Sequence, residues 1–149
     1  MVFERKKGNF TVSTDVARLD VDMIHGFLTD KSYWARGIPK GLVVRAIANS
    51  VCFGLYDGDK QIGYTRAITD TVRFANLLDV FVLEEYRGRG LGTWMMECVM
   101  EYLKPFGLRK ITLATRDAQD FCRKFGFTET ARPANNMEIY YEMPWFKNE

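Results

Sequence analysis

The chain has 149 residues, 47% of them hydrophobic and 27% charged, and a formal net charge of +2. This length suits one compact domain, which we expect to span 1–149. The near balance of charge gives no support for nucleic-acid binding. The three cysteines, Cys52, Cys98 and Cys122, form no C-x-x-C pair, so neither a metal knuckle nor a dithiol redox motif is expected.

The sequence shows no signal-like apolar stretch and no apolar run of bilayer-spanning length. We therefore expect no membrane association. An odd number of widely spaced cysteines favours a reducing compartment, and the expected location is the cytoplasm. The basic run Arg5-Lys6-Lys7 is interpreted as a solvated N-terminal fringe.

In the N-terminal half, alternation predicts a strand at 9–13 and helical spacing predicts a helix at 21–29. Pro39 is suited to open a second helix, because the first helical position needs no N–H donor. Residues 51–56 and 61–68 predict two strands of a hairpin, joined by an Asp-Gly-Asp-Lys turn.

Residues 72–83 form the most hydrophobic predicted strand, which suggests a central place in the sheet. Apolar residues at helical spacing predict an amphipathic helix over 91–104. A short strand at 111–114 and a short helix at 117–125 follow. The last predicted elements are two strands, at 127–130 and 137–143. This order predicts an α/β fold: one mixed central sheet of about six or seven strands, flanked by about four helices.

A glycine-rich turn, Arg87-Gly88-Arg89-Gly90-Leu91-Gly92, lies between the apolar strand and the amphipathic helix. Glycines let the backbone adopt positive φ and approach a ligand closely. A helix N-terminus presents unpaired N–H groups and about half a unit of positive charge. With two arginine side chains beside it, this turn is suited to a diphosphate.

Two other phosphate motifs fit less well. A Walker A loop needs Gly-Lys-Ser/Thr, whereas residues 92–94 are Gly-Thr-Trp. A dinucleotide fingerprint needs G-x-G-x-x-G, whereas this turn is spaced G-x-G-x-G and lies past the middle of the chain. A tight structural turn with surface arginines is the remaining alternative.

The run from Asp79 to Gly92, DVFVLEEYRGRGLG, resembles motif A of the GNAT superfamily of N-acetyltransferases. The run from Asp117 to Phe127, DAQDFCRKFGF, resembles motif B of that family. The two blocks stand in the family's order, with a helix and a strand between them. Glu84 stands where the family often has proline, and Cys122 stands where it usually has tyrosine.

The resemblance implies that acetyl-CoA is the co-substrate, with no metal, and that the acceptor is an amine of a small molecule or peptide. In the family the motif A strand splays away from the next strand, here 111–114, and the thioester lies between them. The residues that the resemblance assigns to CoA are Val80, Phe81, Val82, Arg87, Gly88, Arg89, Gly90, Leu91, Gly92, Thr93 and Thr115.

The implied reaction is direct attack of the amine on the thioester in a ternary complex, with the Val82 N–H as the donor to the thioester oxygen. Asp79 is the candidate base, because a carboxylate is unusual within an apolar strand. Its alternative role is an ion pair or a backbone hydrogen bond. Weaker candidate bases are Asp70, Glu84 and Glu138.

Cys122 is the candidate acid for the leaving thiolate, since a thiol of pKa about 8.5 can donate a proton. Its alternative role is that of a small apolar filler, in which case the donor is a tyrosine or none is needed. The candidate tyrosines are Tyr86, Tyr140 and Tyr141.

Tyr33 and Trp34 follow the first helix, where family members shape the acceptor pocket, and are the candidate substrate residues. The aromatic side chains of Pro144-Trp145-Phe146 are candidates for docking on a partner chain, so a homodimer is considered. Two other functions stay open: a non-catalytic CoA-binding regulatory module, and an acyltransferase that uses a longer acyl-CoA.

Overall fold

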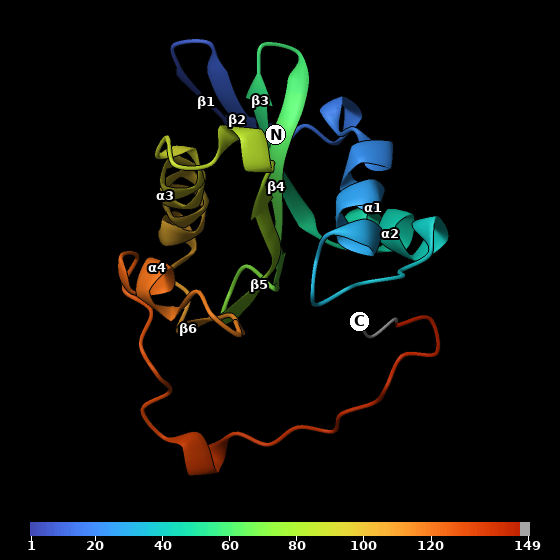
Figure 1. Ribbon diagram of the computed structural model, residues 1–149. Helices are drawn as coiled ribbons and strands as arrows, with labels where there is room; N and C mark the ends of the chain where they lie inside the picture. The colour runs from blue at the N-terminus through green and yellow to red at the C-terminus, as the bar shows by residue number, and fades with distance from the viewer. Residues whose placement is uncertain (147–149) are drawn as a thin grey trace.

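A mixed six-stranded sheet forms the centre of the computed structural model, which describes residues 1–146 (Figure 1). The strands lie side by side in chain order; β1 to β5 pair antiparallel, and β6 pairs parallel with β5. The strands are β1 (Glu4–Lys7), β2 (Phe10–Ser13), β3 (Val51–Asp57), β4 (Lys60–Thr69), β5 (Phe74–Val82) and β6 (Lys110–Thr112).

Helices cover both faces of this sheet (Figure 1). On one face lie α1 (Val21–Asp30) and α2 (Lys40–Ala48), and on the other lie α3 (Leu91–Leu103) and α4 (Gln119–Arg123). The short 3-10 turns are Val16–Arg18, Glu84–Tyr86, Lys104–Phe106 and Pro133–Asn135. The predicted fold class is confirmed. No helix within residues 1–146 is both long and apolar enough to cross a bilayer.

The core has two parts, one on each face of the sheet. Beneath α3, the apolar stripe of that helix packs on β3, β4 and β5, with Met95 and Val99 fully buried. Beneath α1, Phe27 stacks on Phe81 of β5 with a distance of 3.8 Å between ring centroids. The Asp20 carboxylate caps α1 by accepting from the Met23 N–H at 3.0 Å.

A β-bulge interrupts the pairing of β4 with β5. Leu78 pairs with Arg66 and Phe81 pairs with Tyr64, so two residues of β5 lie opposite one residue of β4. One of the two, Asp79, has a left-handed backbone with φ of 56°. Side chains alternate between the two faces of a strand, so residues four apart normally lie on the same face. The extra residue of the bulge moves the side chains that follow it to the opposite face. Leu77 therefore packs beneath α3, whereas Phe81 packs beneath α1.

Arg5-Lys6-Lys7 are solvated, as predicted, but they are not an irregular fringe, because they lie in β1. The turn at Gly8, with φ of 61°, brings β1 back along β2. The four side chains of β1 are all exposed and charged, so the sequence has no alternation of apolar and polar residues here that would indicate a strand. The Arg5 guanidinium pairs with Glu101 of α3 at 2.8 Å, which ties the strand to the helix.

The predictions of strands at 127–130 and 137–143 are wrong. After α4, residues 124–146 run as an arm without strands, and Figure 1 shows it passing beneath the domain toward the side of α1 and α2. A sequence can encode an alternating apolar face, but a strand also needs a backbone partner. Neither stretch has such a partner among the described residues.

Candidate active site

The edge of β5 is open where β6 leaves it. The parallel pairs join only Phe74 to Lys110, Ala75 to Ile111 and Asn76 to Thr112. From residue 77 to 82, β5 has β4 on one side and no described strand on the other. We call residues 77–82 the open edge of β5.

Backbone groups of the open edge point away from β4 at alternate residues. The Leu83 N–H donates to the Ile62 carbonyl at 2.8 Å, so Leu83 faces β4. Because the direction alternates along an antiparallel strand, the Val82 N–H and C=O face the open side. In agreement, the Val82 carbonyl accepts from Nε of Arg87 at 3.0 Å.

The glycine-rich turn joins the end of β5 to α3 and has the geometry of an anion cradle. Gly88 and Gly90 both have φ of 77°, and Gly90 is the residue before the first turn of α3. No described side chain forms a capping hydrogen bond at the start of this helix. Its first backbone bond runs from the Trp94 N–H to the Gly90 carbonyl at 3.0 Å, so the N–H groups of 91–93 precede the hydrogen-bonded ladder.

Gly92 brings the cradle, the open edge and α4 together. A Cβ atom placed on Gly92 would lie 3.5 Å from Val82 Cγ2 and 3.9 Å from Phe121 Cζ. The start of α3 therefore lies directly against the end of β5 and the start of α4. The exposed side chain of Arg89 lies over the Tyr86 ring, with 5.4 Å between guanidinium and centroid.

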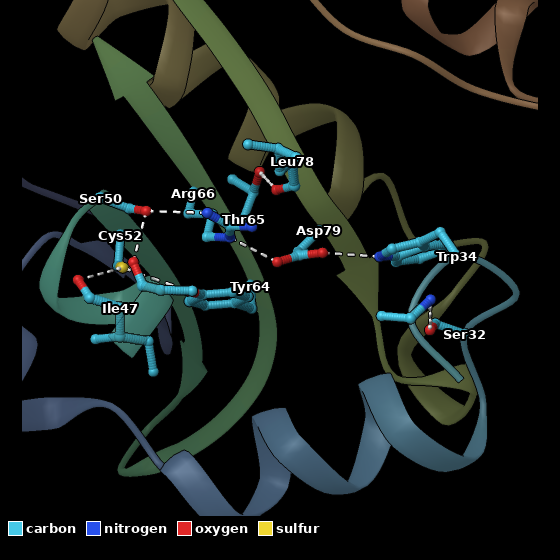
Figure 2. Close-up of polar contacts among 12 residues, drawn as sticks. Ser32, Trp34, Ile47, Ser50, Cys52, Tyr64, Thr65, Arg66, Leu78 and Asp79 are labelled. Atoms are coloured by element: carbon cyan, nitrogen blue, oxygen red, sulfur yellow. Dashed lines mark hydrogen bonds and ion pairs between the residues drawn. The ribbon is translucent and has the colours of Figure 1, made fainter. Parts of the chain in front are cut away.

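Asp79 lies at the bulge and binds two groups (Figure 2). Its Oδ2 accepts from Nε of Arg66 at 2.6 Å, and its Oδ1 accepts from Nε1 of Trp34 at 2.8 Å. The Asp79 side chain is 10% exposed and that of Arg66 15% exposed. Asp79 therefore forms an ion pair, which was predicted as the alternative to its role as a base. A carboxylate has about four lone-pair sites, so these two bonds leave acceptor capacity for a further donor.

Arg66 extends this polar group into the sheet. Its Nη1 donates to Ser50 Oγ at 3.1 Å, and Ser50 Oγ donates to the Ala46 carbonyl at 2.7 Å. The Cys52 thiol and the Tyr64 hydroxyl lie nearby, 3.3 Å apart (Figure 2). Burial raises the pKa of both groups, so both are neutral near pH 7.

The two candidate substrate residues lie on the loop between α1 and α2. Trp34 reaches Asp79, as described, and its ring contacts Tyr33 edge-on at 5.0 Å between centroids. The Tyr33 hydroxyl accepts from the Arg116 backbone N–H at 2.9 Å, and the Arg116 guanidinium lies 3.9 Å from the Tyr33 ring centroid. This contact joins the α1–α2 loop to the segment after β6.

Thr115 and Cys122, the candidate cofactor contact and the candidate acid, have different surroundings. Oγ1 of Thr115 accepts from the Ala118 N–H at 3.0 Å, which stabilises the turn before α4, and its hydroxyl hydrogen remains available to donate. Cys122 is buried in α4, with 8% exposure. Burial raises the pKa of the Cys122 thiol, so the thiol is protonated at neutral pH.

Arg66 and Arg116 belong to this region and were not predicted. Arg66 had a signal: it is a charge within the predicted strand 61–68, beside a predicted strand that holds a lone carboxylate. Opposite charges in neighbouring strands favour a cross-strand pair. Arg116 had no such signal, because its contact with Tyr33 joins segments 83 residues apart. Within residues 1–146, no group of His, Cys, Asp and Glu side chains is placed to hold a metal ion.

Comparison with known proteins agrees with this geometry. Residues 42–127 match the model of the acetyltransferase (GNAT) family. A protein of Gibberella zeae that carries the name of an acetyltransferase is 36% identical, over 74% of each chain. A GNAT-family crystal structure from Xanthomonas campestris is 43% identical, with a TM-score of 0.85, and the match covers 89% of this chain and 93% of the other.

The fold extends to more distant proteins. A GNAT acetyltransferase of Elizabethkingia anophelis, solved with acetyl-CoA bound, is 18% identical with a TM-score of 0.62, over 91% of this chain and 90% of that one. This chain belongs to the GNAT acetyltransferase family, and the protein is an N-acetyltransferase.

Proposed function

We propose that this enzyme transfers an acetyl group from acetyl-CoA to a primary amine of a small molecule or peptide, by direct attack in a ternary complex. The observation that carries the proposal is the open edge of β5 beside the uncapped start of α3. The open edge of β5 offers backbone groups to an extended amide chain. The start of α3 offers N–H groups to a diphosphate.

CoA would bind along this continuous surface. The pantetheine amides would pair with the backbone over Val80, Phe81 and Val82, as an added strand does. Val80 and Val82 would supply the outward groups, because the backbone of Phe81 and Leu83 faces β4. The Thr115 hydroxyl would donate to the same arm. The diphosphate would lie on the N–H groups of residues 87–93, with Arg87 and Arg89 as the nearest cations.

The amine must lose a proton to react. An amine of pKa about 10.4 is neutral in roughly one molecule in a few thousand at pH 7, so a nearby base is useful. Asp79 is the proposed base, through a lone pair that Arg66 and Trp34 do not use. The nitrogen then forms its bond to the acetyl carbon, and the Val82 N–H stabilises the negative charge that develops on the thioester oxygen.

The carbon–sulfur bond breaks as the nitrogen bond forms, and the leaving thiolate of CoA takes up a proton. Cys122 is the proposed donor, because its thiol is protonated at neutral pH. The same burial makes it a weaker acid than an exposed thiol, so its contribution is expected to be small. The acetylated nitrogen loses its second ammonium proton to solvent. After the product leaves, Asp79 releases its proton to solvent and Cys122 regains one from solvent.

The acceptor is proposed to enter beside Tyr33 and Trp34, whose aromatic faces suit a cationic amine. We also propose that residues 1–149 form one domain of this family. The proposed location is the cytoplasm, since all three cysteines are free and buried.

A coupled assay of thiol release tests the proposal. CoA should appear only when acetyl-CoA and an amine acceptor are both present, across a panel of small amines and peptide amines. Cofactor binding without release on any amine would instead favour a non-catalytic CoA-binding module. Thermal stabilisation by acetyl-, succinyl- and long-chain CoA, compared through RT ln(1 + [L]/Kd), identifies the preferred acyl chain.

A further inference from the structure

Arg116 places a cation at the side of the site where the acceptor is proposed to enter. It follows Thr115 on the segment after β6, and its guanidinium lies over the ring of Tyr33 from the α1–α2 loop, 3.9 Å from the ring centroid. The Arg116 side chain is 64% exposed, so a ligand in solution can reach it. The proposed acetyl transfer gives this charge no role.

The backbone of Arg116, rather than its guanidinium, makes the hydrogen bond to Tyr33. The Arg116 N–H donates to the Tyr33 hydroxyl at 2.9 Å. Any residue except proline offers this N–H, so the contact between the two segments does not require arginine at this position. The aromatic ring attracts the guanidinium and holds it in place. The side chain is therefore positioned, and its charge remains available to a ligand.

The Arg116 guanidinium has N–H donors that no described residue uses. A guanidinium carries five N–H groups, and the described hydrogen bonds use only Nη2, which donates to Asp117 Oδ2 at 3.2 Å. Asp117 is 62% exposed, and an ion pair in contact with water contributes little to stability. The other donors suit a carboxylate or a phosphate, which a guanidinium binds through two parallel N–H bonds.

A short path of contacts connects Arg116 with the proposed base. The Asp79 carboxylate accepts from Trp34 Nε1 at 2.8 Å (Figure 2). The Trp34 ring lies 5.0 Å from the Tyr33 ring between centroids, and the Tyr33 ring in turn carries the guanidinium. Each of these contacts is 5.0 Å or shorter, so a small molecule can span the distance between the two charges.

The two ends of this path have opposite charges. Asp79 is the proposed base, and its carboxylate attracts the ammonium form of the reacting amine. Arg116 keeps its positive charge at neutral pH, because a guanidinium does not lose its proton in proteins. A second ammonium group on the acceptor would be repelled at that end, whereas an anionic group would be bound.

We propose that the acceptor is a small amine that carries a carboxylate or a phosphate several bonds from the reacting nitrogen, and that Arg116 binds this anion. The inference rests on the proposed function, because it places the amine at Asp79. The rings of Tyr33 and Trp34 would border the aliphatic part of the acceptor between its two charges. Arg116 then determines specificity, and molecules with several amines, such as polyamines, are poor acceptors.

Acceptors of one length and different charge test this preference. Aminohexanoate and aminohexyl phosphate carry the anion, aminohexanamide is the neutral counterpart, and hexanediamine carries a second cation. For the wild-type enzyme, kcat/KM measured by CoA release should be about tenfold higher for either anionic amine than for aminohexanamide, and lowest for hexanediamine. The ratio of the two anionic amines identifies the preferred anion.

Substitutions at position 116 test whether Arg116 causes the preference. Arg116→Gln keeps the backbone donor and should lower the ratio of kcat/KM for aminohexanoate over aminohexanamide to about one. Arg116→Lys should retain part of this ratio, because the charge remains without the two parallel N–H bonds. Arg116→Glu should make hexanediamine a better acceptor than aminohexanoate. Arg123→Gln is the control on α4: it removes an exposed arginine that pairs with Asp120 and Glu129, and should keep the wild-type ratio.

Calorimetric titration of the CoA-bound enzyme measures acceptor binding apart from turnover. The Kd for aminohexanoate should be about tenfold lower than that for aminohexanamide, and Arg116→Gln should remove this difference. Because it needs no turnover, this measurement decides whether Arg116 binds the anion even if no amine yields CoA, a result that would contradict the proposed function.

Three results overturn the inference and leave the proposed function standing. The first is equal acetylation of the anionic and neutral amines by the wild-type enzyme. The second is a preference for the anionic amines that Arg116→Gln retains. The third is a higher KM for acetyl-CoA in Arg116→Gln with an unchanged acceptor ratio, which would assign the guanidinium to the cofactor.

Discussion

Nε of Arg66 lies 2.6 Å from Oδ2 of Asp79, and this ion pair crosses from β4 to β5 at the bulge of the sheet. It holds the carboxylate in place at the open edge of β5. Trp34 fixes the second oxygen from the α1–α2 loop. The pair thus connects the proposed cofactor strand with the proposed acceptor loop, and its removal should affect both stability and rate.

Asp79→Asn should lower kcat by about 10²- to 10⁴-fold, because the amide cannot accept the proton of the amine. The KM for acetyl-CoA should change little. The variant also leaves Arg66 without a counter-charge, which should lower the free energy of unfolding by about 3 kcal/mol. Steady-state kinetics and urea unfolding measure the two effects.

The double variant Arg66→Met with Asp79→Asn separates these effects. It removes the buried cation as well, so it should recover most of the stability while kcat stays low. If its kcat returned toward wild type, Asp79 would have a structural role only.

Gly90→Ala should raise the KM for acetyl-CoA about tenfold, because it strains the cradle that must lie close to the diphosphate. Gly107→Ala is a matched control, since Gly107 also has positive φ and open space around its Cβ position but lies after α3. In both variants an alanine is held in the left-handed backbone region, which should lower the free energy of unfolding by about 1–2 kcal/mol. An equal rise in KM for both variants would place the diphosphate elsewhere.

Trp34→Phe keeps an aromatic ring beside Phe27 and Tyr33 but removes the N–H that donates to Asp79. A hydrogen bond to a charged group contributes about 1.5–3 kcal/mol, so loss of this orienting bond should lower kcat by about tenfold or more. Trp94→Phe on α3 serves as the control and should leave kcat unchanged. An unchanged kcat for Trp34→Phe would show that the carboxylate needs no orientation by the indole.

Alkaline pH should destabilise the protein through Cys98. Burial, followed by the charge of Glu101, raises the pKa of the Cys98 thiol to about 11, above an unfolded value of about 8.5. The unfolded chain therefore loses its proton first as pH rises. The contribution of the protonated Cys98 thiol to the free energy of unfolding is fully present below about pH 8.5 and is lost as pH rises toward 11.

Cys98→Ala removes this contribution. The free energy of unfolding of the variant should fall less steeply between pH 8.5 and 11, by up to about 1.4 kcal/mol per pH unit. The slopes of the free energy of unfolding against pH are compared, because the substitution also leaves a small cavity that lowers this free energy at every pH. Equal slopes for the two proteins would contradict the raised pKa.

Local pattern by itself determined most of the helices and the antiparallel strands. The apolar period of 91–104 predicted α3, and the Asp-Gly turn predicted the hairpin of β3 and β4. The glycine turn before α3 also had a sequence signal, because positive φ and an uncapped helix start depend on neighbouring residues only.

Tertiary structure decided what depends on partners distant in the chain. The charged strand β1 forms because β2 lies beside it, and residues 137–143 form no strand because nothing described lies beside them. The role of Asp79 likewise depended on Arg66 and Trp34, which reach it from another strand and another loop. Backbone pairing and buried charge pairs are satisfied between distant segments, so a local sequence pattern cannot specify them.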